Sequence, residues 1–346
     1  MSYEPEVSEA SDVSVPPLAG PAGVAGPADV GEDASWQLFR GDGTRRTTPL
    51  PAAPPWRRFS DPEPTGEDDD GPRYVIGAAE TDVINAALHL RRPLLVTGHP
   101  GTGKSSLAAA IAHELDLGPV LHWPVNSRST LQDALYRYDA IGRLQETNLH
   151  RDSPGDTPDI GTFVRLGPMG TALVPAERPR LLLVDELDKG DIDLPNDLLT
   201  VFEDGTFEIP ELSRLPEDRS QVNVLTADPH RRSLVTRGMV RCTEFPVVVI
   251  TSNGERDFPP AFRRRCLPLH LGDPDETRLR AIIASHLGAR ALDGAEDLVT
   301  AFLNQRAVGE LATDQLLNAV FLRSGGARLD ADGLLKTLLH RLNSGG

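Results

Sequence analysis

The sequence predicts an α/β fold: a parallel sheet covered by helices, a small all-helical domain after it, and an unstructured tail before it. Between residues 73 and 272, short apolar runs that end in glycine or polar residues alternate with helical segments, as in a parallel sheet buried on both faces. From residue 273 onward the apolar spacing is helical only. Residues 1–72 show no sustained apolar periodicity.

The tail, residues 1–72, contains 12 of the 30 prolines and has five arginines against fourteen acidic residues, which gives −9 of the net charge of −16. Such a segment cannot bury enough apolar surface to offset the entropy of ordering it, so we expect disorder. Two aromatic islands interrupt it, at 36–41 and 54–59. They dock on the folded domain or on a partner, or they are isolated hydrophobic residues in a flexible tail.

The sheet domain is expected to begin with a helix within 76–90, to carry a long loop or irregular insertion over 137–160, and to carry an inserted hairpin within 210–244. The expected strands are 93–97, 120–123, 180–186, 206–209, 245–253 and 267–271. The expected helices between them are 104–115, one starting at 129–135, 194–203 and 261–265. The helical domain should contain helices at 276–287, 292–304, 314–322 and 330–342.

A glycine-rich turn follows the first expected strand. It contains Gly98, His99, Pro100, Gly101, Thr102, Gly103, Lys104, Ser105 and Ser106, and positions 98–105 fit the phosphate-binding pattern G-x-x-x-x-G-K-[ST]. The glycines let consecutive N–H groups turn around a polyphosphate, and the next helix points its positive end at the same anion. We expect Lys104 to reach the outer phosphates and Ser105 to ligate Mg²⁺. A plain glycine turn is the alternative, but the flanking strand and helix favour nucleotide binding.

Two further strand ends carry polar residues that suit phosphate chemistry. Asp185 and Glu186 end one apolar run, and Asn253 ends another. The carboxyl ends of parallel strands face one crevice, so these side chains should meet the glycine-rich turn. We expect Asp185 to hold Mg²⁺, Glu186 to take a proton from the attacking water, and Asn253 to bind that water or the terminal phosphate. Each residue alone could be a cap or a turn residue; together they predict nucleotide hydrolysis.

A run of three arginines, Arg263, Arg264 and Arg265, precedes the last strand. It is either a basic helix end that interacts with the helix dipole or an arginine finger that enters the site of a neighbouring subunit.

Composition limits the other classes of function. The acidic balance argues against general binding to nucleic acid or to an anionic membrane, although a local basic patch would be compatible with it. The chain has no apolar run of 18 residues and no basic-then-apolar start, so we expect a soluble, cytoplasmic protein. Cys242 and Cys266 form no CxxC pair and predict neither a metal site nor a disulfide framework.

The set of motifs resembles the AAA+ ATPases, most closely the MoxR branch. The stretches that carry the resemblance are GHPGTGKSS at 98–106, LLLVDELDK at 181–189, VVVITSNGERDFPPAFRRRC at 247–266 and the C-terminal helices. Residues 129–146 and 191–212 are also similar to that branch. The resemblance covers about residues 74–345 and leaves the tail outside it.

The resemblance implies a P-loop NTPase αβα core over 73–272, a helical lid over 273–346, ATP and Mg²⁺ as cofactors, and a ring, usually a hexamer, that remodels a protein client. MoxR-like ATPases often work with a partner that bears a von Willebrand factor A domain. By motif position, Arg265 matches the arginine finger and Arg264 is its neighbour. Asp314 stands where the family commonly has a sensor-2 arginine; Arg306 or Arg323 could replace that arginine, and the sequence selects neither.

The leading hypothesis is therefore an ATP-driven remodelling motor. The first rival is a switch that signals through ATP-dependent assembly and hydrolyses slowly. A nucleic-acid-coupled GTPase or ATPase ranks third, because the chain has no N-K-x-D motif and its charge is unfavourable. A metabolite kinase fits Asn253 and the arginine run less well.

Overall fold

The computed structural model describes residues 38–39, 45, 47, 49–57, 74–149, 159–329 and 333–340. The chain divides into two units, Met1–Pro51 and Ala52–Gly346, and every element named below belongs to the second. Most of the tail predicted to be disordered, and the domain boundary predicted after Pro72, fall outside the described residues. One described part of the tail, η1 (Pro55–Arg57), forms a 3₁₀ turn.

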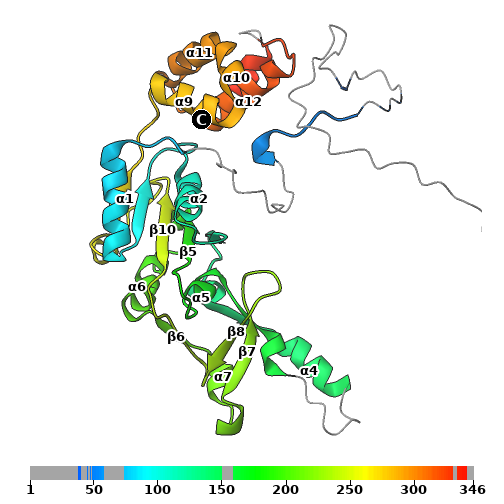
Figure 1. Cartoon of the computed structure of the whole chain (residues 1–346), viewed down its shortest axis with the longest axis vertical. Helices are drawn as coiled ribbons and strands as arrows, with labels where there is room; N and C mark the ends of the chain where they lie inside the picture. The colour runs from blue at the N-terminus through cyan, green and yellow to red at the C-terminus, as the bar shows by residue number, and fades with distance from the viewer. Residues whose placement is uncertain are drawn as a thin grey trace, which may run out of the picture. The chain divides into compact units, whose positions relative to one another are not determined.

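Five parallel strands form the central sheet. They are β1 (Leu94–Thr97), β2 (Leu121–Pro124), β5 (Leu181–Asp185), β10 (Val247–Ser252) and β11 (Leu267–His270). Their order across the sheet is β11-β1-β10-β5-β2, visible in part in Figure 1. These are predicted strands, each found within two residues of its expected bounds, and the α/β fold class is confirmed.

Helices cover both faces of this sheet. The helices of the core are α1 (Ala78–Leu90), α2 (Lys104–Glu114), α3 (Leu131–Leu135), α5 (Pro168–Ala172), α6 (Leu194–Asp204) and α8 (Pro260–Arg263). Alternate side chains of β5 enter two different clusters: Leu181 and Leu183 pack with α1 and α2, whereas Leu182 and Val184 pack with α5 and α6. This explains why the strand is apolar at every position instead of at every second one.

The inserted segments build a second sheet. Its strands are β3 (Tyr136–Tyr138), β4 (Val164–Leu166), β6 (Thr206–Glu208), β7 (Gln221–Leu225), β8 (Arg232–Thr236) and β9 (Met239–Arg241), in the order β3-β4-β7-β8-β9-β6. Short turns accompany them: η2 (Ile160–Phe163), α7 (Pro210–Ser213) and η4 (Glu217–Arg219). A further turn, η3 (Leu187–Lys189), follows β5 of the central sheet. The hairpin expected within 210–244 is the antiparallel pair β7 and β8.

Residues 137–160, predicted to form a long loop or an irregular insertion, contain regular secondary structure where the structure describes them. The described part contains β3 and the helix α4 (Ala140–Leu149); residues 150–158 lie outside the description. α4 buries no residue, and its apolar side chains Ile141 and Leu144 are exposed. Its visible signal is Asp139, whose carboxylate accepts the N–H of Gly142 at 2.8 Å, as a helix cap does.

The lid is all helical. Its helices are α9 (Glu276–Leu287), α10 (Ala289–Asp293), α11 (Glu296–Arg306), α12 (Thr313–Ser324) and α13 (Leu334–Leu338). The single helix expected at 292–304 is divided in two near Gly294, and the last helix is shorter than expected. Leu279, Phe302 and Leu316 belong to a core cluster separate from the two clusters of the sheet domain, so the lid has its own hydrophobic interior.

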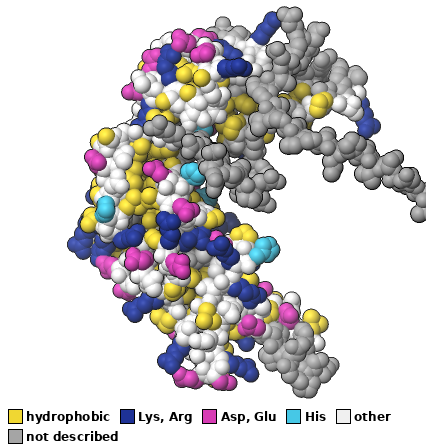
Figure 2. All heavy atoms as spheres, viewed as in Figure 1, with side chains coloured by type: hydrophobic (Ala, Val, Ile, Leu, Met, Phe, Trp, Pro, Cys, Tyr) yellow, Lys and Arg dark blue, Asp and Glu magenta, His cyan; other side chains and the backbone are white. Residues whose placement is uncertain are grey.

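The surface mixes both signs of charge. Figure 2 shows Lys and Arg side chains gathered beside Asp and Glu side chains on the visible face of the described core. Within the described ranges, no helix is long and apolar enough to cross a membrane.

Candidate functional site

The predicted phosphate loop connects β1 to α2. Gly101 and Gly103 have φ angles of 76° and 86°, a left-handed backbone that a side chain disfavours. Gly101 also packs against the start of α12, because a Cβ placed on it would lie 2.5 Å from the Cβ of Ala312 and 2.9 Å from the backbone nitrogen of Thr313. Both backbone angle and contact with the lid therefore require glycine at position 101.

Lys104 is held inside this loop. It is only 7% exposed, and its Nζ donates to the carbonyl oxygens of Gly98 and His99, both at 2.8 Å. Burial lowers the pKa of Lys104, while nearby carboxylates, that of Asp188 first, oppose the shift. The ammonium is thus placed where phosphate oxygens could take over from the two carbonyls.

The predicted metal ligands Ser105 and Asp185 meet. Oδ1 of Asp185 accepts hydrogen bonds from Ser105 Oγ at 2.8 Å and from Thr251 Oγ1 at 2.6 Å, and Oδ2 lies 3.2 Å from His122 Nε2. Burial alone would raise the pKa of Asp185, but the hydrogen bonds from His122, Thr251 and Ser105 outweigh it and lower the pKa to about 2. The carboxylate is therefore ionised at neutral pH.

These oxygens fit Mg²⁺. The ion is a hard cation that proteins usually hold through one or two side-chain oxygens, with water and substrate phosphates completing its shell. Ser105 and Asp185 supply one hydroxyl and one carboxylate beside the phosphate loop. The two supporting residues, Thr251 and His122, were not predicted from the sequence. Thr251 is a hydroxyl at the end of an apolar run, which was the available signal.

Glu186 and Asn253, predicted at two strand ends, are brought together. Asn253 Nδ2 donates to Glu186 Oε1 at 3.3 Å, and Lys189 Nζ lies 2.8 Å from Glu186 Oε2. Glu186 has a left-handed φ of 58°, and its N–H donates to Thr251 Oγ1 at 2.8 Å. A non-glycine residue in this conformation is held by its surroundings, and such positions cluster at functional sites.

A buried acid that sequence reasoning missed fixes the turn after β10. Asp188 is 3% exposed, and its Oδ2 accepts the backbone N–H groups of Asn253 at 2.9 Å and of Glu255 at 3.1 Å. Asp188 therefore positions the backbone of Asn253, whose side chain in turn reaches Glu186. The third acidic residue of the Asp185–Asp188 stretch was the signal for this role.

The arginine run lies at the opposite end of the sheet. Leu94 at the start of β1 pairs with Leu267 at the start of β11, whereas the phosphate loop follows the other end of β1. Four residues of strand separate the two ends by about 13 Å. Arg265 pairs with Glu203 of α6 and donates to the carbonyl of Ala261 at 3.2 Å. Among the described residues, no hydrogen bond or ion pair engages the exposed side chain of Arg264. The chain thus does not bring these arginines to its own phosphate loop.

Two cavities adjoin the loop on the side of the lid. The larger has a volume of about 630 Å³ and is lined by Thr102, Gly103 and Ser106 of the loop region and by Asp314 of α12. The smaller, of about 280 Å³, is lined by His99 and Pro100 together with lid residues. The exposed Asp314 therefore faces the larger cavity, where the sequence analysis expected an arginine.

The structure separates the two arginines that could replace the one expected at Asp314. Arg306 lines the smaller cavity and donates to the carbonyl of Pro274 at 2.7 Å. Arg323 pairs with Asp297 and donates to the carbonyl of Gly294 at 3.1 Å, both within the lid. Arg306 is therefore the one that shares a cavity with the phosphate loop.

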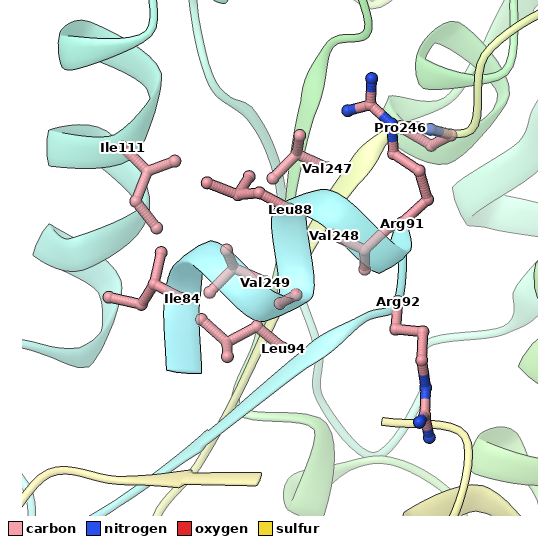
Figure 3. Close-up of a pocket in the computed structure, with 11 residues that line it drawn as sticks. Ile84, Leu88, Arg91, Arg92, Leu94, Ile111, Pro246, Val247, Val248 and Val249 are labelled. Carbon is pink, nitrogen blue, oxygen red and sulfur yellow. The ribbon is translucent and has the colours of Figure 1, made fainter. Parts of the chain in front are cut away.

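A third pocket, drawn in Figure 3, is not a ligand site. It lies among apolar residues of α1, α2, β1 and β10, including Ile84, Leu88, Ile111 and Val249, with Arg91 and Arg92 at its edge. Its volume is about 10 Å³. That is at most the room one water molecule needs, so a nucleotide could not enter.

The family model described as "AAA domain (dynein-related subfamily)" matches residues 93–266. No curated protein matches the chain. Among solved structures, the chain is similar to that of a protein from Cytophaga hutchinsonii named as a candidate ATPase, with 16% identity and a TM-score of 0.35. The match covers 63% of this chain and 50% of the other, so the chain spans half the length of that protein.

Proposed function

Because the chain belongs to the AAA domain family, dynein-related subfamily, we propose that it binds ATP with Mg²⁺ and hydrolyses it as a ring-forming, MoxR-like remodeller of a protein client. One observation carries the proposal: the phosphate loop, the Ser105–Asp185 pair and the Glu186–Asn253 pair meet at the carboxyl ends of β1, β5 and β10. This is the crevice in which open parallel sheets bind ligands.

The residues divide the work of hydrolysis between them. Lys104 would leave the carbonyls of Gly98 and His99 and contact phosphate oxygens. Ser105 and Asp185 would hold Mg²⁺, which when bound neutralises charge on the phosphates. Glu186 would accept the proton of the attacking water. Asn253 would orient Glu186 or that water.

The position of the arginines supports a site shared between subunits. Arg264 and Arg265 lie at the end of the sheet away from the phosphate loop of their own chain, so a phosphate that they contact would be bound to another copy. A ring, such as a hexamer, places each arginine run beside the next subunit's site. We propose a protein client, with a von Willebrand factor A domain protein as the first candidate.

Two ion pairs are compatible with a second candidate, a switch that signals through assembly and hydrolyses slowly. In the single chain Glu186 is paired with Lys189, and Arg265 is paired with Glu203. Assembly that opened the Arg265–Glu203 pair would free the arginine to act in a neighbouring site. Turnover that depends on assembly is the shared feature of the two candidates; the maximal rate distinguishes them.

The test compares Glu186→Gln and Lys104→Ala in the full chain. Glu186→Gln should bind ATP, form a ring detectable by mass photometry, and lose at least 99% of turnover, since a positioned base contributes about 10²–10⁴-fold. Lys104→Ala should lose nucleotide binding. The exposed Lys336→Ala is the matched control and should behave as wild type. Turnover at the wild-type rate in Glu186→Gln would refute the assigned base. Proteins that co-purify with the trapped ring identify the client.

A further inference from the structure

The larger cavity continues beyond the phosphate loop to a tryptophan from the tail. The residues that line it include Gly101–Gly103 of the loop and Trp56 of η1. Gly101 packs against Thr313 in the first turn of α12, whereas Trp56 packs against Phe321, eight residues or about 12 Å further along that helix. α2 lines the same cavity with Ala109 and Ala110, whose small side chains leave the space open. Ala110 is six residues after Lys104, or about 9 Å further along the helix axis. A ligand whose phosphates occupy the loop would therefore extend along α2 toward Trp56.

Trp56 is anchored on the lid. Its ring meets the ring of Phe321 on α12 edge to face, with centroids 5.9 Å apart and an interplanar angle of 67°. It also packs against the hydrophobic core of the lid and is half-buried. Figure 1 shows η1, the short blue helical turn, near the lid. Trp56, a large aromatic side chain in a polar, proline-rich tract, thus packs against the lid.

Part of the cavity lining is suited to a flat apolar group. Ile282 of α9 and Leu317 of α12 line the cavity together with the two alanines of α2. Tyr74 closes the loop side, since its hydroxyl donates to the carbonyl of Gly103 at 3.1 Å. Aromatic rings and aliphatic side chains around a cavity recognise planar bases by stacking and burial. One cavity therefore joins the phosphate loop to side chains that could contact a base.

We propose that Trp56 is a further nucleotide-binding residue that closes the base end of the cavity. The residue lies outside the segment 93–266 that matches the family, so the tail supplies part of the site. The proposal rests on the proposed nucleotide-binding function. It predicts that Trp56 contributes to the binding of the base and sugar part and contributes nothing to the binding of the phosphates.

The experiment measures calorimetric affinity of the full chain for ADP and for inorganic tripolyphosphate, which has no base. Trp56→Ala should weaken ADP about tenfold, the scale of a lost base–aromatic stacking contact, and leave tripolyphosphate unchanged. Trp56→Phe should recover most of the ADP affinity. Leu50→Ala is the matched control, because it removes an apolar side chain of the tail that is 82% exposed, and it should bind both ligands as wild type does.

The outcomes separate this proposal from the function on which it rests. Equal ADP affinity in wild type and Trp56→Ala would overturn the role of Trp56 while leaving the phosphate site intact. An equal loss for both ligands would also overturn it, since it would indicate structural damage. Failure of the wild type to bind either ligand would overturn the proposed nucleotide site itself. A tryptophan fluorescence change on adding ADP that disappears in Trp56→Phe would support direct contact.

Discussion

The hydroxyl oxygen of Ser105 lies 2.8 Å from Oδ1 of Asp185, although eighty residues separate them in the chain. Ser105 lies in the first turn of α2, and Asp185 ends β5, two positions across the sheet from β1. The same Oδ1 accepts the Thr251 hydroxyl of the strand between them. Thr251 of β10 thus holds the end of β5 at the point where the metal ion is proposed to bind.

Replacing Thr251 with valine should impair hydrolysis more than its shape change suggests. The Thr251 side chain is fully buried. The substitution removes its hydrogen bond to Asp185 and leaves the backbone N–H of Glu186 without an acceptor. We expect about tenfold or greater loss of Mg²⁺-dependent ATPase activity, measured by phosphate release over an Mg²⁺ titration, and about 1–3 kcal/mol of lost stability.

Thr206→Val provides the control for this change. Thr206 donates to the carbonyl of Val240 in the second sheet, away from the phosphate loop. It should lower stability without changing the Mg²⁺ dependence of activity. If Thr251→Val kept the wild-type Mg²⁺ dependence, the hydroxyl would have no role beyond packing.

Subunits that lack Arg265 should complement subunits that lack the base. Arg265→Ala and Glu186→Gln are each expected to reduce turnover at least a hundredfold, because an arginine finger contributes about 10³–10⁵-fold and a base about 10²–10⁴-fold. In mixtures, an intact arginine of one variant can meet an intact base of the other across an interface. Phosphate release by mixed samples should exceed that of either variant alone. Mixtures without any recovery would exclude Arg265 as a finger acting in trans.

Arg306 should matter for nucleotide binding, and Arg323 should not. Arg306 shares a cavity with the phosphate loop, whereas Arg323 is paired within the lid. Arg306→Ala should weaken ATP binding by about tenfold, the scale of one charge-assisted hydrogen bond, and Arg306→Lys should lose less. Calorimetry on Arg323→Ala serves as the control. A larger effect of Arg323→Ala than of Arg306→Ala would reverse the assignment.

The ion pair between Arg180 and Asp228 should make stability depend on pH. Arg180 bonds both carboxylate oxygens of Asp228, at 2.7 Å and 3.0 Å, and both side chains are largely buried. Hydrogen bonding by Arg180, opposed by burial, lowers the pKa of Asp228 below its ordinary 3.8. Ionised Asp228 therefore stabilises the folded state above pH 3.8. This contribution to the free energy of unfolding disappears as the pH falls through the lowered pKa of Asp228.

Urea unfolding checks this linkage. At pH 7, Asp228→Asn should lower the free energy of unfolding by about 2 kcal/mol, and the difference from wild type should shrink below about pH 4. Glu217→Gln, which alters an exposed pair with Arg237, should change stability by less than about 1 kcal/mol. A difference for Asp228→Asn that stays constant from pH 7 to pH 3 would contradict the assigned ionisation.

The sequence by itself determined the elements whose causes are local. Runs such as Leu181–Val184 predict buried strands because every position is apolar, and the glycines between Gly98 and Lys104 predict the loop because other residues could not adopt its backbone. Since parallel strands end at one edge, the sequence also predicted that Asp185, Glu186 and Asn253 would meet there. Helix α4 was not predicted, and it buries none of its residues.

Only the tertiary structure decided which side chains become partners across long separations. The order β11-β1-β10-β5-β2 places Thr251 beside Asp185, and the packing of the lid brings Arg306 to one cavity and Trp56 to the other. It also pairs Arg265 with Glu203, far from its own phosphate loop. These contacts depend on strand order and on the docking of distant segments, which no local spacing or propensity encodes.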